Sequence, residues 1–173
     1  MNLTASQLAN VDRVAVTLGV PSDWILAVVR NESNGDPRAK NPRSSARGLI
    51  QFVDATAKSL GYDSSLDLVG QNPSFESQMA GPVLRYLSWY KPFPTFASLA
   101  GAVFYPAYRN KPLALLPDNV RAVNPFKTLQ EYADSVWRKY KGIKIVEASL
   151  VPLLVIGGGL WWYLRRGRLR KRS

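Results

Sequence analysis

The chain has 173 residues, no cysteine and no histidine, and a formal net charge of +11. Its length supports one ordinary domain with an appendage. The missing residue types exclude disulfides, thiolate nucleophiles, and catalytic or zinc sites that depend on histidine. Acid–base chemistry is therefore left mainly to aspartate and glutamate, and we expect no metal and no cofactor.

Residues 1–142 predict a mainly α domain, because apolar residues recur at helical spacing and no alternating strand pattern is present. Gly81-Pro82 should kink or split one of the helices, and Gly142 suggests a boundary. The expected helices are 6–18, one opening at Pro21 and reaching Glu32, 54–59, 72–90, one from Thr95 to before Pro106, and one behind a capping box at 128–131.

The C-terminal residues have a different composition. Residues 145–164 are an apolar run with one charge, Glu147, and six basic residues follow between Arg165 and Arg172. About 20 apolar residues cross the hydrocarbon core of a bilayer, and basic residues flank such spans. The sequence therefore predicts a transmembrane helix over 143–164 and a basic tail over 165–173; the alternative is a buried core helix with a solvated tail.

Glu32 is the strongest candidate for a catalytic residue. It continues the apolar stripe of Ile25, Val28 and Val29, which would withdraw its carboxyl group from water and raise its pKa. A loop rich in glycine, proline and serine follows over 33–48, and such a loop lets the backbone approach a substrate closely. On spacing alone, a solvated glutamate at a helix end is the favoured interpretation.

The residues around Glu32 narrow the interpretation. The stretch Glu-Ser-Asn-Gly-Asp-Pro at 32–37 and the stretch Asn-Pro-Arg-Ser-Ser-Ala-Arg-Gly-Leu-Ile-Gln-Phe at 41–52 resemble the soluble lytic transglycosylase family, and most of all its phage versions. A second stretch, Val-Phe-Tyr-Pro-Ala at 103–107 with Lys-Pro at 111–112, is similar to a segment of phage members. The resemblance covers about residues 8–140 and implies a fold related to goose-type lysozyme.

The resemblance also implies roles for individual residues. Glu32 corresponds to the single catalytic acid and base, Gln51 to a glutamine lining the site, and Tyr105 to a tyrosine that steadies the glutamate. Two differences from the family pattern stand out: Pro106 replaces the usual asparagine, and the span from Glu32 to Gln51 is one residue longer. Where the family often has serine this chain has Asn41, so Ser44 or Ser45 is expected to take that polar role in binding substrate.

The implied reaction is cleavage of the bond between N-acetylmuramic acid and N-acetylglucosamine in peptidoglycan. Glu32 would protonate the bond and then remove a proton from the muramic C6 hydroxyl, which closes a 1,6-anhydro ring. Asp36 and Asp54 are alternative second carboxylates, and with one of them in the cleft the enzyme would be a hydrolytic muramidase. Otherwise they form a loop turn and a helix N-cap. A non-catalytic structural virion protein with a degenerate site is the alternative outside enzymes.

The expected partners and location follow from both ends of the chain. No signal peptide is visible at the N-terminus. We therefore expect a single-pass membrane protein, located in the internal membrane of a phage virion or, alternatively, in the bacterial inner membrane with the enzyme facing the periplasm. The expected partners are peptidoglycan glycan strands, the lipid membrane and other virion proteins, with the packaged genome as a candidate for contact with the basic tail.

Overall fold

The computed structural model describes residues 1–149, and the side chains of residues 1–142. The chain divides into one compact unit, Met1–Tyr140, and a second from Lys141 onward. In the first unit, helices and loops make up the structure. Its helices are connected by loops, and its only pairing of extended backbone consists of three isolated bridges, among them Lys40 with Arg47 and Arg47 with Phe52. This part of the chain is mainly helical, as the periodicity predicts.

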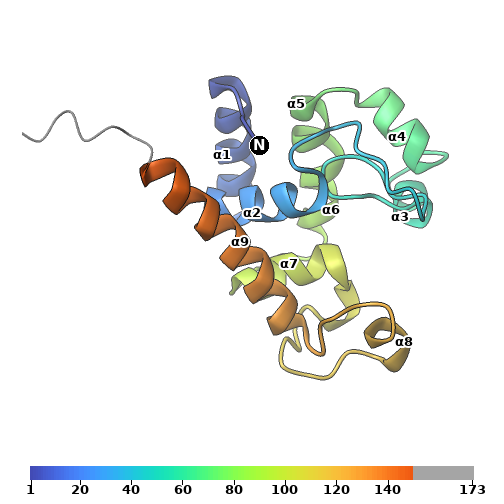
Figure 1. Cartoon of the computed structure of the whole chain (residues 1–173). Coiled ribbons are helices and arrows are strands. Elements are labelled where there is room, and N and C mark those ends of the chain that lie inside the picture. Colours follow the sequence, from blue (N-terminus) through green and yellow to red (C-terminus); the bar gives the residue numbers. More distant parts are fainter. Residues whose placement is uncertain (150–173) are drawn as a thin grey trace, which may run out of the picture. The chain divides into compact units, whose positions relative to one another are not determined.

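The first unit contains the helices labelled in Figure 1. Most are short, and only α1, α2 and α9 exceed ten residues. Their bounds are α1 Ala5–Leu18, α2 Ser22–Ser33, α3 Asp54–Ser59, α4 Ser65–Gln71, α5 Phe75–Gln78, the π-helical turn η1 Met79–Val83, α6 Leu84–Ser88, α7 Phe96–Phe104, the 3₁₀ turn η2 Pro106–Tyr108, α8 Asp118–Arg121 and α9 Leu129–Ser149.

Local signals in the sequence explain several of these boundaries. Thr4 and Gln7 form a capping box at the start of α1, and Gly19 ends it in the left-handed conformation at φ 71°. The long helix expected over 72–90 is instead α5, η1 and α6 in succession, with the π turn containing Gly81 and Pro82. Helix α4, which begins behind the capping residue Ser64, has no counterpart among the expected helices.

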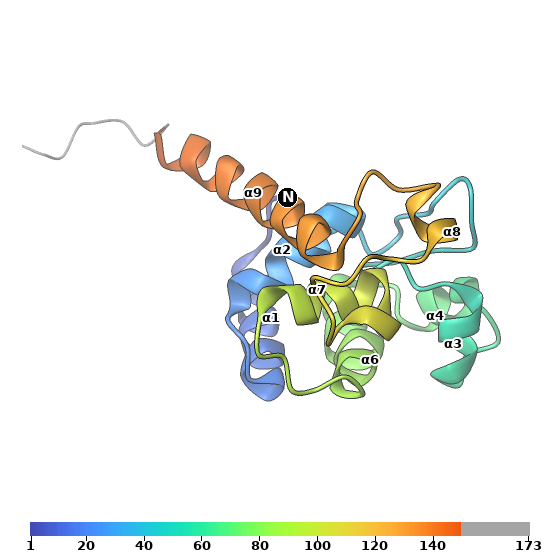
Figure 2. The same cartoon turned by 90° about the horizontal axis from the view of Figure 1, so that it is seen from below.

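The apolar stripe of α2 lies in the core. Ile25, Val28 and Val29 are all at most 2% exposed. Helix α9 runs alongside α2 in the opposite direction, since the hydroxyl of Tyr132 donates to Glu32 and that of Tyr140 donates to Asp23, each at 2.7 Å. Figures 1 and 2 show the first turns of α9 beside α2 and α7. Two hydroxyl groups of α9 therefore bond to acidic groups near opposite ends of α2.

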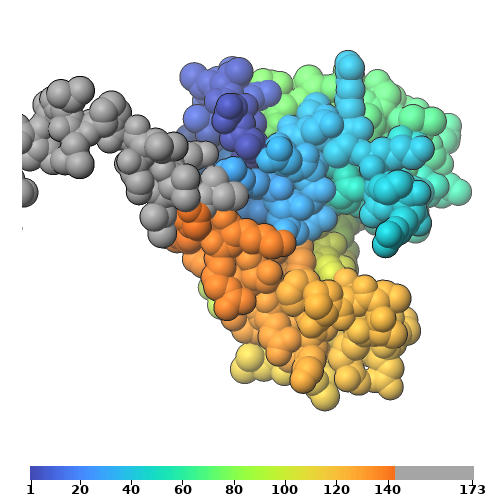
Figure 3. All heavy atoms as spheres, in the orientation of Figure 1, coloured from blue at the N-terminus to red at the C-terminus, as the bar shows by residue number. Residues whose placement is uncertain are grey.

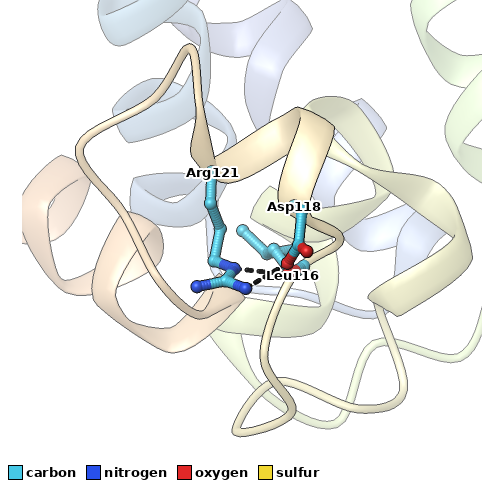
Figure 4. Close-up of polar contacts among 3 residues, drawn as sticks. All are labelled: Leu116, Asp118 and Arg121. Carbon is cyan, nitrogen blue, oxygen red and sulfur yellow. Dashed lines mark hydrogen bonds and ion pairs between the residues drawn. The ribbon is translucent and has the colours of Figure 1, made fainter.

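Residues 106–127 form a lobe with little regular structure, as their four prolines indicate. Its short helix α8 is held by Arg121, which forms an ion pair with Asp118 and donates from Nε to the carbonyl of Leu116 at 2.9 Å (Figure 4). Leu116 itself is 1% exposed, and its amide donates to the carbonyl of Lys127 at 2.9 Å. Leu116 therefore anchors the lobe to the core.

The transmembrane helix predicted over 143–164 is contradicted. In the part of the chain that the structure describes, no helix is long and apolar enough to cross a membrane. The helix that enters the predicted span is α9, which continues through Gly142 and includes the charged residues Arg138, Lys139, Lys141 and Lys144. The predicted fold class is corrected on this point, and so is the localisation as a single-pass membrane protein. Residues 150–164 and the basic tail lie outside the described residues, and the predicted domain boundaries remain predictions.

Candidate functional site

Glu32 is the next-to-last residue of α2 and is partly buried. Its Oε1 accepts hydrogen bonds from the hydroxyl of Tyr132 at 2.7 Å and from Nδ2 of Asn31 at 3.1 Å. The same Asn31 amide lies 3.3 Å from the Tyr132 oxygen, so the three side chains form a closed triangle. One carboxylate oxygen of Glu32 is thus held by two donors, and neither donor bonds to Oε2.

Burial raises the pKa of Glu32 above its ordinary value, because the charged form loses solvation. The hydrogen bonds from Tyr132 and Asn31 and the positive charge of Lys139 lower that pKa, but burial is the largest effect. Burial also raises the pKa of Tyr132, with the nearby Glu32 charge acting in the same direction. Tyr132 therefore stays protonated and donates to the carboxyl group of Glu32.

Tyr132 connects Glu32 to a neighbouring hollow. Its ring stacks on the ring of Phe104 with the centroids 4.2 Å apart and the planes 15° apart. Phe104 lines a hollow of about 220 Å³ whose wall also comes from the segment before α3, from α6 and from the start of η2. The other lining residues are Ile50, Gln51, Phe52, Val53, Thr56, Tyr86, Val103 and Pro106.

Figure 3 shows the surface around this hollow. The light blue to cyan segment that follows α2 borders it above, and the yellow to orange lobe of residues 106–127 borders it below. The lining residues of α7 and η2 belong to the yellow-green chain visible between these walls. We call the notch between these two segments the groove, with residues 33–53 as its upper wall and residues 106–127 as its lower wall.

Uncharged side chains fix the loop after Glu32. The hydroxyl of Ser33 lies 2.9 Å from the carbonyl of Leu49 and accepts from the amide of Gly35 at 3.2 Å. Gln78, which is fully buried, accepts from the amide of Leu49 at 2.9 Å and donates to the carbonyls of Pro37 at 2.7 Å and Asn72 at 2.9 Å. Because each bond satisfies a backbone group, the loop is set in one conformation.

The other residues expected to bind substrate lie along the same loop. Gln51 lines the hollow, has a left-handed backbone at φ 56°, and donates from Nε2 to the carbonyl of Gly48 at 3.0 Å. Asn41 and Ser44 are exposed and accept from the amides of Arg43 and Ala46, at 2.9 Å and 3.2 Å. The Ser45 hydroxyl accepts from the amide of Asp54 at 3.1 Å. Asn41 and Ser44 therefore stabilise turns, and Ser45 connects the loop to the first residue of α3.

Tyr105 is the remaining residue that the sequence predicts for the site. It follows the last residue of α7, and its ring packs against Tyr108 with the centroids 5.4 Å apart. The hydroxyl that donates to Glu32 is that of Tyr132, and the role in steadying the glutamate that the resemblance implies for Tyr105 stays a prediction. The helical periodicity places Tyr132 on the buried face of its helix, but periodicity carries no signal for a hydroxyl that bonds 100 residues away. The residues next to Gln78 and Asn31 in the sequence likewise give no indication of the hydrogen bonds that these two side chains make.

The two alternative carboxylates form bonds within the loops. Oδ1 of Asp36 accepts from the amide of Arg38 at 2.8 Å, which forms a turn. Oδ1 of Asp54 accepts from both the amide and the hydroxyl of Ser65 at 2.8 Å, and these bonds lower the pKa of Asp54. Asp54 is the first residue of α3 rather than its cap. Among the side chains described, no group of three or more acidic residues could hold a metal ion.

The comparison with protein families addresses the first part of the chain. Residues 10–84 match the Transglycosylase SLT domain. The SLT match supports an SLT-like domain, and it includes Glu32, Gln51 and Gln78 but ends before Phe104 and Tyr132. The mainly helical structure is consistent with a lysozyme-like SLT domain. The match suggests lytic transglycosylase activity on peptidoglycan. No curated protein matches the chain.

Proposed function

We propose that this protein is a peptidoglycan lytic transglycosylase with Glu32 as its only catalytic carboxyl group. The observation that carries the proposal is the position of Glu32, which lies within the SLT match, is partly buried, and is held by Tyr132 beside an open hollow. A carboxyl group that acts as a general acid near neutral pH needs a raised pKa, and burial raises the pKa of Glu32.

The hydrogen bonds around Glu32 suggest how the two oxygens divide the work. Oε1 accepts from Tyr132 and Asn31, so Oε2 is the oxygen that carries the transferable proton. Glu32 donates that proton to the oxygen between N-acetylmuramic acid and N-acetylglucosamine as the bond breaks. The resulting carboxylate then takes the proton of the muramic C6 hydroxyl, whose oxygen closes the 1,6-anhydro ring. No water is consumed, and Glu32 ends protonated again.

The polar residues of the loop after Glu32, and Tyr105, which precedes η2, take supporting roles in this proposal. Gln51 lines the hollow and is suited to bind the sugar next to the scissile bond. Asn41, Ser44 and Ser45 would hold the loop in shape through their hydrogen bonds and contribute to the substrate surface. Tyr105 adjoins Pro106 at the edge of the hollow, where its ring would contact the glycan.

A hydrolytic muramidase is the alternative within enzymes, and it needs a second carboxylate or an activated water near Glu32. The bonds of Asp36 and Asp54 to their own loops count against that alternative.

We also propose that the enzyme acts as a phage virion protein that opens the wall at genome entry, because the stretches at 41–52 and 103–112 resemble phage versions of the family. Mass spectrometry of purified particles would test this setting, and absence of the protein from particles would contradict it.

The activity is tested by digesting purified sacculi with the full chain and with Glu32→Gln, followed by mass analysis of the fragments. We expect fragments with anhydro-muramic ends from the wild type, and a loss of about 10²–10⁴-fold in Glu32→Gln, the usual contribution of a general acid. Glu76→Gln on α5 is the matched control and should digest sacculi normally. Fragments heavier by one water would identify a hydrolase. No fragments from the folded wild type would favour a structural protein.

A further inference from the structure

The loop after Glu32 carries an uncompensated positive charge. Residues 38–47 contain Arg38, Lys40, Arg43 and Arg47, which we call the basic loop, and no acidic residue lies between Asp36 and Asp54. Arg38, Lys40 and Arg43 are exposed, and Arg47 is half-buried. Within the part of the chain whose side chains are described, the one ion pair is that of Arg121 with Asp118, so none of these four cations is paired.

The backbone brings two of these charges together. Lys40 and Arg47 are opposite each other in an isolated antiparallel bridge, flanked by the hydrogen bond from the amide of Asn41 to the carbonyl of Ala46 at 2.9 Å. Side chains at such positions are neighbours, and like charges directly opposite each other destabilise the pairing. The basic loop therefore holds two cations side by side without an ion pair to either, although the charge of Arg47 acts on Asp54 and helps to lower its pKa.

The four cations have no evident structural task. The bonds that shape the loop come from Ser33, Gln78, Asn41 and Ser44 and from backbone groups. The nearest acidic residues also have other partners, because Asp36 bonds to the amide of Arg38 and Asp54 bonds to Ser65. The positive side chains thus project from a frame that uncharged groups already hold.

The basic loop adjoins the candidate site. The carbonyl of Ala39, next to Lys40, accepts from the amide of Gly48 at 2.9 Å and lies 3.5 Å from Nε2 of Gln51. Gln51 in turn lines the hollow. The segment containing the basic loop is the light blue to cyan wall above the groove in Figure 3. A polymer in that groove would therefore pass close to the basic loop.

We propose that the basic loop binds the carboxylates of the peptide stems carried by the glycan, so that the preferred substrate is peptide-bearing rather than naked peptidoglycan. This inference rests on the proposed function. The sugars of a peptide-bearing strand are uncharged, because the lactyl carboxyl group of muramic acid forms the amide bond to the peptide. Each peptide is thus attached to the sugar whose bond Glu32 would cleave. Cations spread over ten residues fit several carboxylates along a flexible peptide better than a single small anion, and arginine binds carboxylates in two-pronged fashion.

The test compares two substrates: intact sacculi, and glycan strands from the same sacculi after enzymatic removal of the peptides and conversion of the freed lactyl carboxyl groups of muramic acid to amides. The variant Lys40→Gln with Arg43→Gln removes two exposed charges of the basic loop, and Arg13→Gln with Arg85→Gln removes two exposed charges from α1 and α6 as the control. For the full chain we expect the ratio of kcat/KM on peptide-bearing to naked strands to fall about fivefold in the loop variant, from the usual strength of two exposed ion pairs. The control should keep the wild-type ratio, and added salt should reduce the wild-type preference.

A binding measurement separates this inference from the proposed function. Glu32→Gln, alone and combined with the two loop substitutions, is tested for retention on both kinds of strand, so the result needs no activity. Preferential retention on peptide-bearing strands that the loop substitutions abolish supports the inference. Equal retention on both strands, or a preference that the substitutions leave intact, overturns it. Sacculi stripped of phosphate-containing polymers provide a third substrate, and a preference lost on that treatment alone would overturn the inference in favour of phosphate binding.

Discussion

The two walls of the groove are built differently. The upper wall, residues 33–53, is shaped by hydrogen bonds from side chains to backbone groups, and the buried Gln78 provides two of them, to Pro37 and Leu49. The lower wall, residues 106–127, has one ion pair and exposes the apolar side chains of Leu113, Leu115 and Val123, each at least 60% accessible. The wall that follows the candidate catalytic residue is thus fixed from behind, and the opposite wall is only lightly held.

Gln78→Leu should have the largest effect on stability. Leucine fills the same space but leaves the amide of Leu49 and the carbonyls of Pro37 and Asn72 without partners. At about 1–3 kcal/mol for each buried unsatisfied group, we expect the free energy of unfolding to fall by about 3 kcal/mol or more. Urea denaturation measures this change. A loss below about 1 kcal/mol would show that the upper wall does not depend on Gln78.

Gly48→Ala tests the same wall from the other side. Gly48 has φ 78°, and an added Cβ would lie 2.5 Å from Oε1 of Gln78, which is held by its bonds. Gly61→Ala is the matched control, since Gly61 has φ 84° and nothing within 4 Å of the added atom. We expect a loss of about 1 kcal/mol for Gly61→Ala from the left-handed backbone, and about 2–3 kcal/mol for Gly48→Ala because the collision is added. If urea denaturation gave equal losses of unfolding free energy for the two variants, the contact with Gln78 would not contribute to stability.

Tyr132→Phe removes the hydroxyl that bonds to Glu32 but keeps the ring that stacks on Phe104. We expect kcat on sacculi to fall about tenfold, equivalent to about 1.4 kcal/mol, because the carboxyl group loses its orientation. Since this hydrogen bond lowers the pKa of Glu32, its removal should move the loss of activity with rising pH to higher pH. Tyr140→Phe, which removes the equivalent bond to Asp23, should leave that pH profile unchanged.

Arg121→Gln should have the smallest effect. It breaks the ion pair with Asp118 and the bond to Leu116 in the lower wall, where the two charged side chains are 37% and 94% exposed. Exposed pairs contribute little, so we expect the free energy of unfolding to fall by less than about 1 kcal/mol. A loss as large as that of Gln78→Leu would mean that the lower wall is as firmly built as the upper one.

The same contrast explains how much the sequence alone can predict. Helix α2, its buried stripe, the loop after Glu32 and the break at Gly81-Pro82 depend on nearby residues, and the structure agrees with those expectations. Tyr132 depends on α9 returning alongside α2, so its bond to Glu32 has no local signal. Gln78 lies in a segment whose sequence predicts an ordinary helix, and two of its three partners, Pro37 and Leu49, are 41 and 29 residues away along the chain.

The transmembrane prediction failed for a related reason. The apolar run from residue 145 was considered without the charged helix that leads into it, whereas α9 is one helix from Leu129 to Ser149. The family resemblance points to Tyr105, by motif position, as the tyrosine that steadies the glutamate. The hydroxyl that donates to Glu32 is that of Tyr132, because the side chain that reaches a carboxyl group is decided by helix packing rather than by motif spacing.

The account's central claim is that burial keeps Glu32 ready to donate a proton. The most direct test is an NMR titration of the Glu32 side-chain carboxyl carbon in the full chain, with Glu32→Gln identifying the signal. The account predicts a pKa above the ordinary glutamate value, because burial outweighs the bonds from Tyr132 and Asn31. A pKa at or below the ordinary value would mean that the carboxyl group is ionised near neutral pH, and Glu32 could not then be the general acid proposed.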